Sequence, residues 1–260
     1  MTAPLTEPAI VSTLRAAGCV FAEDEARLIV STARTPGEVA AMVERRAAGE
    51  PLEHVLGWAM FCGLRIAVEP GVFVPRPRTE FLVRRARALA PPRPVVLDLC
   101  CGSGALGAAL ASGTDRCVLH AADIEPAAVR CARGNIAPYG GTAHEGDLFD
   151  PVPDELRGRV DVLLANVPYV PTEDVALMPA EARDHEPRSA LDGGPDGLDV
   201  LRRVTAEAEL WLAPGGRLLF ETSERQVAAA VAAVEAGGLA SEVATSDDFY
   251  ATVIVGAKPV

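Results

Sequence analysis

The sequence predicts an α/β domain, in which helices cover a mostly parallel sheet, preceded by a small helical unit. From about residue 95 onward, short apolar runs typical of strands buried on both faces alternate with helical stretches. This alternation indicates a parallel sheet, because parallel strands need a crossover between them. Before about residue 55 the apolar residues recur at helical spacing instead. A chain of 260 residues, 49% of them hydrophobic, can build one such domain with a small companion.

The N-terminal part predicts three short amphipathic helices followed by a β-hairpin. The third helix begins at Thr35 and Pro36, since proline is favoured in the first helical turn, and ends before Gly49. The segment FCGLRIAVEPGVFVP alternates in hydrophobicity and contains a Glu-Pro-Gly turn at 69–71, which predicts a hairpin over about 61–74. The helices are expected at 10–17, 23–32 and 35–48.

The main domain is expected to begin with a helix from Thr79 to about Ala90. A proline-rich breaker at 91–94 then precedes the apolar run VVLDL, which predicts the first buried strand. Strands are expected at 95–99, 117–122, 160–165, 216–221 and 251–257, with helices near 104–112, 126–136, 197–212 and 223–236. The chain thus divides into a helical unit (1–55), a hairpin with a connector (56–78) and the main domain (79–260).

Composition and charge narrow the class of protein. The net charge of −12 disfavours a protein that wraps a phosphate backbone, because such proteins carry a basic face. No run approaches the ~20 apolar residues of a membrane span, and the first residues lack the pattern of a signal peptide. The six cysteines form no C-x-x-C pair and no histidine is spaced like a metal ligand. We therefore expect a cytoplasmic protein with no metal site and no membrane contact.

A glycine-rich turn follows the first predicted strand, in the run VLDLCCGSGALG. Asp98 lies near the end of that strand, and the turn itself consists of Cys100, Cys101, Gly102, Ser103 and Gly104. Glycines let the chain turn tightly and let a ligand touch the backbone, while the helix N-terminus offers free N–H groups to an anion. Such turns also occur where a chain simply reverses, so the motif is weak by itself.

Two further acidic strand ends strengthen the case for a nucleotide-like cofactor. Asp123 ends the next predicted strand, where a carboxylate can accept both hydroxyls of a ribose, although it could otherwise cap the following helix. In the run GDLFD, Asp147 and Leu148 lie where the loop after another strand would reach an adenine. Ligands of parallel sheets bind at the carboxyl ends of the strands, so these residues are expected to meet at one edge.

The run Asn166-Val167-Pro168-Tyr169 ends the next apolar strand. As a plain turn it needs no function, because asparagine and proline are ordinary turn residues. As a site it can hold an amide or amino nitrogen: the Asn166 side-chain oxygen and a backbone carbonyl next to Pro168 can each accept one N–H and aim the lone pair at an electrophile. Pro168 also has no N–H to compete for those acceptors, and Tyr169 offers a flat face for stacking.

The order of these motifs resembles that of S-adenosylmethionine-dependent methyltransferases, which have a Rossmann-like, seven-stranded sheet. Over most of the chain, the resemblance is to the HemK-type family, which methylates the glutamine side-chain amide of peptide-chain release factors. In that family the region that corresponds to His185–Asp199 lies around the substrate cleft. The matching segments are PLEHVLGWAMFCGLRIAVEPGVFVPRPRTEFLV, DLCCGSGALGAALA, GDLFD, NVPYVPT and HEPRSALDGGPDGLDVLRRV.

The resemblance implies an enzyme with an N-terminal substrate-recognition domain, a linking hairpin and a release factor as its protein substrate. A monomer that binds no nucleic acid directly is expected. The implied catalytic residues are Asn166, Pro168 and Tyr169, and the implied substrate contacts are these three and Val167. The implied contacts to S-adenosylmethionine are Asp98, Cys100, Cys101, Gly102, Ser103, Gly104, Asp123, Asp147, Leu148 and Asn166.

Three positions depart from the family pattern. Val167 replaces the first proline of the usual Asn-Pro-Pro-Tyr, Cys100 replaces the first glycine of the cofactor loop, and Arg78 replaces an acid in the connector.

Because of these departures, three alternative functions stay open. A methyltransferase for adenine amines in nucleic acid shares the chemistry but is disfavoured by the net charge. A divergent paralogue could act on another protein or on a small-molecule amide. A binding protein could keep the cofactor pocket without catalysis, but the presence of Asn166 and Tyr169 argues against this last alternative.

Overall fold

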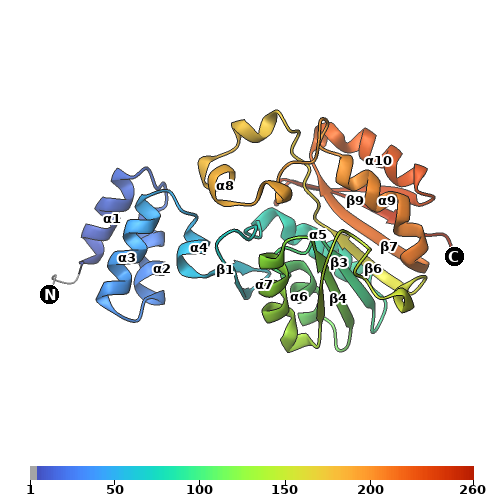
Figure 1. The fold of residues 1–260 in the computed structure, drawn as a ribbon, viewed down its shortest axis with the longest axis horizontal. Helices are drawn as coiled ribbons and strands as arrows, with labels where there is room; N and C mark the ends of the chain where they lie inside the picture. The colour runs from blue at the N-terminus through green and yellow to red at the C-terminus, as the bar shows by residue number, and fades with distance from the viewer. Residues whose placement is uncertain (1–4) are drawn as a thin grey trace.

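A seven-stranded sheet forms the centre of the main domain in the computed structural model, which describes residues 5–260 (Figure 1). Its strands lie in the order β5-β4-β3-β6-β7-β9-β8, and all neighbours pair in parallel except β9, which is antiparallel to β7 and β8. The predicted α/β class with a mostly parallel sheet is therefore confirmed. The strands are β3 (Val95–Leu99), β4 (Val118–Asp123), β5 (Thr142–Glu145), β6 (Val160–Ala165), β7 (Leu212–Thr222), β8 (Ala240–Ser246) and β9 (Ala251–Ala257).

Helices cover both faces of this sheet. One face, which carries Val96, packs against α5 (Glu80–Leu89), α6 (Ala105–Ser112) and α7 (Pro126–Ile136). The opposite face, which carries Leu97 and Leu99, packs against α9 (Asp199–Trp211) and α10 (Val227–Ala236). Because successive strand residues point to opposite faces, both faces need apolar residues, which explains the unbroken apolar runs in the sequence.

All five strands for which the sequence predicted a range are present, but it predicted no range for β5 or β8. These two strands lie at the two edges of the sheet. Their sequences, TAHE and ASEVATS, mix polar and apolar residues, since an edge strand is partly exposed to water. The pattern that identifies a strand buried on both faces is therefore missing from them.

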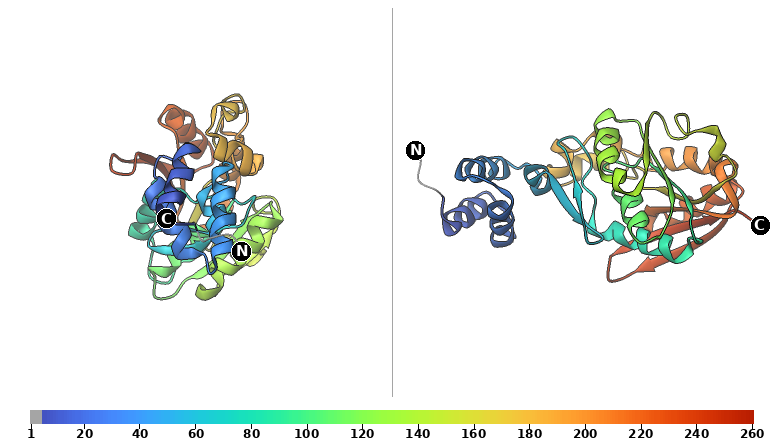
Figure 2. Two further views of the ribbon diagram at one scale, coloured as in Figure 1. Left: turned by 90° about the vertical axis from the view of Figure 1, so that its left-hand side faces the viewer. Right: turned by 90° about the horizontal axis from the view of Figure 1, so that it is seen from below.

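The N-terminal helices form a unit with its own apolar core, which includes Ile10, Leu14 and Ile29. The helices are α1 (Glu7–Ala16), α2 (Ala22–Thr32) and α3 (Pro36–Ala47), so the three predicted helices are confirmed. This unit extends away from the sheet along the long axis of the molecule (Figures 1 and 2). A short helix, α4 (Leu52–Leu56), leads from it toward the main domain.

The predicted position of the hairpin was wrong. Strands β1 (Trp58–Phe61) and β2 (Leu64–Ala67) pair antiparallel around a turn at Cys62 and Gly63, rather than around the turn at 69–71. Cys62 and Gly63 have φ of 51° and 77°, and a two-residue loop with two left-handed residues matches the twist of paired strands. The turn at 69–71 comes after the hairpin, and there the Val72 N–H donates to the Glu69 carbonyl (3.1 Å).

A long segment between β6 and α9 contains α8 (Ala180–His185) and arches over the main domain (Figure 1). Arg46 of α3 connects it to the helical unit, because its guanidinium pairs with Glu25 of α2 (2.7 Å) and with Glu181 of α8 (2.6 Å).

None of the helices in residues 5–260 is long and apolar enough to cross a membrane. Single turns of 3₁₀ helix occur at Pro77–Thr79, Ala137–Tyr139, Asp154–Leu156, Asp174–Leu177, Arg188–Ala190 and Glu224–Gln226.

Candidate active site

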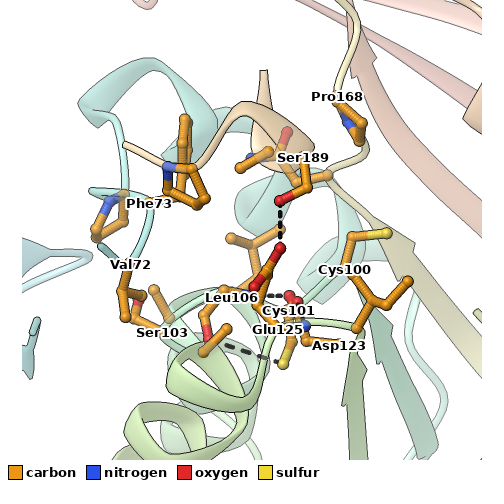
Figure 3. A pocket seen from close by; sticks show the side chains of 18 of the residues that line it. Val72, Phe73, Cys100, Cys101, Ser103, Leu106, Asp123, Glu125, Pro168 and Ser189 are labelled. Carbon is orange, nitrogen blue, oxygen red and sulfur yellow. Dashed lines mark hydrogen bonds between the residues drawn. The ribbon is translucent and has the colours of Figure 1, made fainter. Parts of the chain in front are cut away.

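The carboxyl ends of β3, β4 and β6 open into one cavity (Figure 3). From β3 the chain continues on one side to β4 and β5, and then returns to the other side of β3 for β6. The loops at this point diverge to opposite sides, which leaves a crevice where ligands of parallel sheets bind. Of the residues expected to hold a cofactor, the lining contains Cys100, Cys101, Gly102, Ser103, Asp123 and Asn166. The structure places the others outside this lining: Asp98, Gly104, Asp147 and Leu148.

Gly102 and Gly104 have different roles in the loop after β3. Gly102 has φ of +52° and lines the cavity, and a Cβ built on it would meet nothing closer than the Phe73 Cβ at 3.9 Å. Gly104 has φ of +74°, and a Cβ there would lie 3.0 Å from the Ala132 Cα of α7. Gly102 therefore leaves the backbone open to a ligand, whereas Gly104 lets the loop pack against a helix.

Asp98 supports this loop from within the core. It is 1% exposed, and its Oδ2 accepts the N–H of Gly107 in α6 (2.9 Å). Its Oδ1 has no hydrogen-bond partner among the described residues. Burial raises the pKa of Asp98 to about 8, because the charged carboxylate is desolvated there.

Cys100 adopts a left-handed backbone conformation, with φ of 52°, which suits glycine better than cysteine. Its side chain packs against the core on the α9 and α10 side of the sheet, and Figure 3 shows the sulfur directed away from Val72 and Phe73. The thiol therefore points away from the centre of the cavity (Figure 3).

We expect Cys100→Gly to bind S-adenosylmethionine at least as tightly as the parent. The thiol that this substitution removes points away from the centre of the cavity, so no contact with the ligand is lost. Relief of the left-handed strain and the added chain entropy of glycine oppose each other, so unfolding free energy should stay within ~1 kcal/mol of the parent. Calorimetric titration and urea unfolding measure the two quantities. The control Cys101→Gly lacks that relief, because φ of Cys101 is not positive, and it should be less stable. A marked loss of binding in Cys100→Gly would show that the thiol contacts the ligand.

Asp123 holds its carboxylate at the cavity through two backbone contacts. Its Oδ2 accepts the N–H of Gly102 (2.8 Å) and its Oδ1 accepts the N–H of Glu125 (2.9 Å). Burial raises the pKa of Asp123, since desolvation outweighs these hydrogen bonds. The next residue, Ile124, also lines the cavity and is 56% exposed. An exposed aliphatic side chain beside a carboxylate suits a ligand with an apolar ring next to hydroxyl groups.

Asn166 and Pro168 line the same cavity from the end of β6. The Oδ1 atom of Asn166 is buried and has no hydrogen-bond partner among the described residues. An unpaired buried acceptor costs roughly 1–3 kcal/mol, so it is uncommon in a native structure unless a ligand completes it. A residue of the cavity lining thus has a free acceptor position on its amide oxygen.

Tyr169 belongs to the same loop, but its side chain leads away from this cavity. Its hydroxyl donates to Glu221 Oε1 (2.8 Å) and accepts from Arg78. The Arg78 guanidinium lies 5.8 Å from the centre of the Tyr169 ring, so one face of the ring is partly covered. The sequence suggested a free face for stacking, whereas the structure holds the ring in a polar network at the back of the loop.

Asp147 and Leu148 also lie apart from the cavity. The Asp147 carboxylate pairs with Arg203 of α9 (2.6 Å) and both side chains are about half exposed. An exposed pair of this kind contributes at most ~1 kcal/mol, so a ligand at the adjacent loop could displace it. Leu148 is buried and has a left-handed φ of 46°.

The segment that follows α8 braces the loop after β6. The Val170 N–H donates to the Leu191 carbonyl (3.1 Å), and the Gly193 N–H donates to the Val170 carbonyl (2.8 Å). A Cβ on Gly193 would lie 2.7 Å from the Pro168 carbonyl oxygen, so only glycine permits this approach. Part of the HEPRSALDGGPDGLD motif therefore fixes the position of the loop that carries Asn166.

The same segment and the connector close the cavity on a side that sequence reasoning missed. Glu186, whose side chain is fully buried, pairs with Arg76 (2.6 Å) and accepts the N–H of Val74 (3.0 Å). Ser189 donates to Glu125 (2.6 Å) and so joins this segment to the loop after β4 (Figure 3). The motif HEPRS pointed to this region, but no local pattern indicated which residues face the cavity.

No group of three or more His, Cys, Asp or Glu side chains in residues 5–260 is arranged to hold a metal ion. Within the same range all six cysteines are free thiols.

Comparisons with known proteins agree with this geometry. Residues 63–192 match the Methyltransferase small domain family. The chain is 41% identical over 191 residues to a release factor glutamine methyltransferase from Geobacter sulfurreducens, which covers 72% of this chain and 66% of that protein. It is 39% identical over 230 residues to a protein of the same name from Mycolicibacterium smegmatis, which covers 86% of this chain and 81% of that protein.

A relative with another substrate is also similar. A 4-amino-L-phenylalanine/4-methylamino-L-phenylalanine methyltransferase from Streptomyces pristinaespiralis is 38% identical over 203 residues, which is 75% of this chain and 69% of that protein. Among solved structures, a methyltransferase from Pyrococcus furiosus has a TM-score of 0.58 at 18% identity, over 76% of this chain and 90% of that one.

Proposed function

Since the chain belongs to the family of release factor glutamine methyltransferases, we propose that it transfers a methyl group from S-adenosylmethionine to the side-chain amide nitrogen of a protein glutamine. The proposed acceptor is the glutamine in the Gly-Gly-Gln loop of a peptide-chain release factor. The names of these relatives give a release factor as their substrate.

The unpaired oxygen of Asn166 is the observation that supports this chemistry most directly. An amide nitrogen is a weak nucleophile, because its lone pair is delocalised into the carbonyl. Asn166 Oδ1 can accept one N–H of the acceptor, and a backbone carbonyl next to Pro168 can accept the other. These two acceptors aim the lone pair and favour a pyramidal nitrogen in the transition state. No general base is required before attack, since the nitrogen can release its proton afterwards.

The cavity fits S-adenosylmethionine, which supplies an electrophilic methyl group on a sulfonium sulfur. Asp123 would accept the ribose hydroxyls, and Ile124 would pack against the adenine. The open side of Gly102 leaves room for the ligand against the backbone. Asp98 and Gly104 are proposed to act indirectly, because they shape the loop after β3. Asp147 and Leu148 would contact the adenine only after the Asp147–Arg203 ion pair breaks.

We assign recognition of the release factor to the helical unit, residues 1–55, together with α8. The pairs that Arg46 makes with Glu25 and Glu181 hold these two parts in a fixed relation, which supports the assignment. The acidic surface of the chain can attract a basic partner and repel nucleic acid. The enzyme is proposed to act as a monomer in the cytoplasm, where free thiols such as its six persist.

A small-molecule amine is the second candidate acceptor, because the Streptomyces pristinaespiralis relative is named for an aromatic amino acid and not for a protein. Both candidates place a nitrogen with two N–H groups beside Asn166. They differ in what the helical unit must recognise.

The test incubates the protein with S-adenosylmethionine that carries a labelled methyl group. Separate reactions contain a class I release factor, the same factor with alanine in place of its Gly-Gly-Gln glutamine, ribosomal RNA, duplex DNA and 4-amino-L-phenylalanine. We expect label only in the unchanged release factor, and digestion with mass spectrometry should locate it on the glutamine. Label in RNA adenine, or in the amino acid alone, would contradict the proposal.

A further inference from the structure

Glu221 lies buried near the end of β7, in contact with the connector and with the loop that carries Asn166. It is 4% exposed, and each of its two oxygens has a partner. Oε2 accepts the hydroxyl of Thr79, which lines the cavity (2.8 Å). Oε1 accepts the hydroxyl of Tyr169 (2.8 Å) and forms an ion pair with Arg78, whose Nε lies 2.8 Å away. One carboxylate thus joins the connector, the loop after β6 and the central sheet.

A second contact from the same stretch of chain holds the backbone of Tyr169. The Gln226 side chain donates through Nε2 to the Tyr169 carbonyl (2.9 Å) and to the Asp196 carbonyl (2.9 Å). Its Oε1 accepts the hydroxyl of Ser223 (2.6 Å). With all its hydrogen-bonding groups paired, Gln226 has one well-defined orientation. Tyr169 is therefore held at its hydroxyl by Glu221 and at its carbonyl by Gln226.

We propose that Glu221 is a positioning residue for methyl transfer, which acts through the Tyr169 hydroxyl to fix the loop that presents Asn166. The proposal rests on the proposed function of Asn166 as the acceptor-binding residue. Glu221 is not itself part of the cavity lining. Its Oε1 reaches the loop that carries Asn166 through the Tyr169 hydroxyl, whereas its Oε2 holds Thr79 of the lining. A charge-assisted hydrogen bond to a buried carboxylate restricts the ring strongly, because the carboxylate is itself held by the Thr79 hydroxyl and by the ion pair with Arg78.

The orientation of Asn166 matters because its oxygen must meet a nitrogen that is being aimed at a methyl group. A misplacement of about 1 Å in such an arrangement can lower a rate on the order of 100-fold. Cofactor affinity depends on Asp123 and the Gly102 loop, neither of which contacts Glu221. Loss of the Glu221–Tyr169 hydrogen bond should therefore appear in kcat and leave cofactor binding nearly unchanged.

The kinetic test uses Glu221→Gln, Tyr169→Phe and the double variant, assayed by labelled methyl transfer to the release factor. We expect each single variant to lose roughly 10-fold in kcat, with the dissociation constant of S-adenosylmethionine within about 3-fold of the parent. The double variant should lose little more than either single one, because Glu221→Gln removes the charge that strengthens the hydrogen bond and Tyr169→Phe removes the same hydrogen bond altogether. Losses that multiply to roughly 100-fold, or an equal loss of cofactor affinity, would overturn the proposal. Tyr169→Phe leaves Glu221 paired with Arg78 and Thr79, so it should fold even if Glu221→Gln does not.

A spectroscopic readout needs no acceptor. The chain has 3 tyrosines, so tyrosine labelled with ¹³C at the ζ carbon gives three NMR signals, and Tyr169→Phe identifies the one from Tyr169. We expect this signal to shift in Glu221→Gln. It should stay in place in Glu242→Gln, which removes an exposed glutamate paired with Arg85 (2.7 Å) elsewhere on the sheet.

The two readouts separate the failure of this proposal from the failure of the proposed function. An unchanged Tyr169 signal in Glu221→Gln would overturn the positioning role, whatever the acceptor is. If the parent methylates no release factor, the proposed acceptor is wrong, and the Tyr169 signal still decides whether Glu221 orients this ring.

Discussion

Asn166→Ala is expected to lower the turnover of methyl transfer by ~100-fold or more, while affinity for S-adenosylmethionine stays within a few-fold of the parent. The Asn166 oxygen is buried and has no hydrogen-bond partner among the described residues, so under the proposed function it gains its hydrogen bond when the acceptor binds. In the proposed mechanism this bond aligns the acceptor nitrogen and strengthens as the nitrogen becomes pyramidal. The loss should therefore appear mainly in kcat. Single-turnover transfer and calorimetric titration measure the two effects separately.

The stability of the same variant gives an independent check. Removal of an unpaired acceptor costs no hydrogen bond in the folded state, so the thermal midpoint should not fall. The matched control is Asn135→Ala, because Asn135 bonds to the Ala67 N–H, the Ala67 carbonyl and the Ser103 carbonyl at 2.8–2.9 Å. That variant should lose several degrees. Equal losses of binding and turnover in Asn166→Ala would instead make Asn166 a cofactor contact only.

Asp123→Ala is expected to weaken S-adenosylmethionine binding by about 10- to 100-fold, equivalent to ~1–3 kcal/mol. Two effects act in the same direction. The ribose hydroxyls lose their acceptor, and the N–H groups of Gly102 and Glu125 lose the carboxylate that now orders both loops. Calorimetry with S-adenosylmethionine and with S-adenosylhomocysteine should give similar losses, since the two ligands share the ribose.

Asp161→Ala is the control for this variant. Asp161 lies at the opposite end of the sheet, where its carboxylate accepts one backbone N–H, that of Val95 (2.8 Å). Its replacement should lower stability by ~1 kcal/mol and leave cofactor affinity unchanged. Unchanged binding in Asp123→Ala would remove Asp123 from the site, and an equal loss in Asp161→Ala would mean that the effect comes from stability alone.

The sequence alone determined the class of fold and the edge of the sheet that carries the site. Strands buried on both faces leave unbroken apolar runs, and parallel strands place their carboxyl ends together, so the loops after β3, β4 and β6 had to meet. The residue types at those ends indicated a nucleotide-like cofactor and hydrogen-bond acceptors for an amide or amino nitrogen. These conclusions depend on local periodicity and on topology that every parallel sheet shares.

Only the tertiary structure decided which side chains face the cavity. The edge strands β5 and β8 carry no strong apolar pattern, and the hairpin turns at Cys62 and Gly63 because two left-handed residues fit there. Tyr169 turns toward Glu221, which is 52 residues away, and Thr79 reaches the same carboxylate across 142 residues. Partners so far apart in the chain leave no local pattern, because packing of the whole domain selects them.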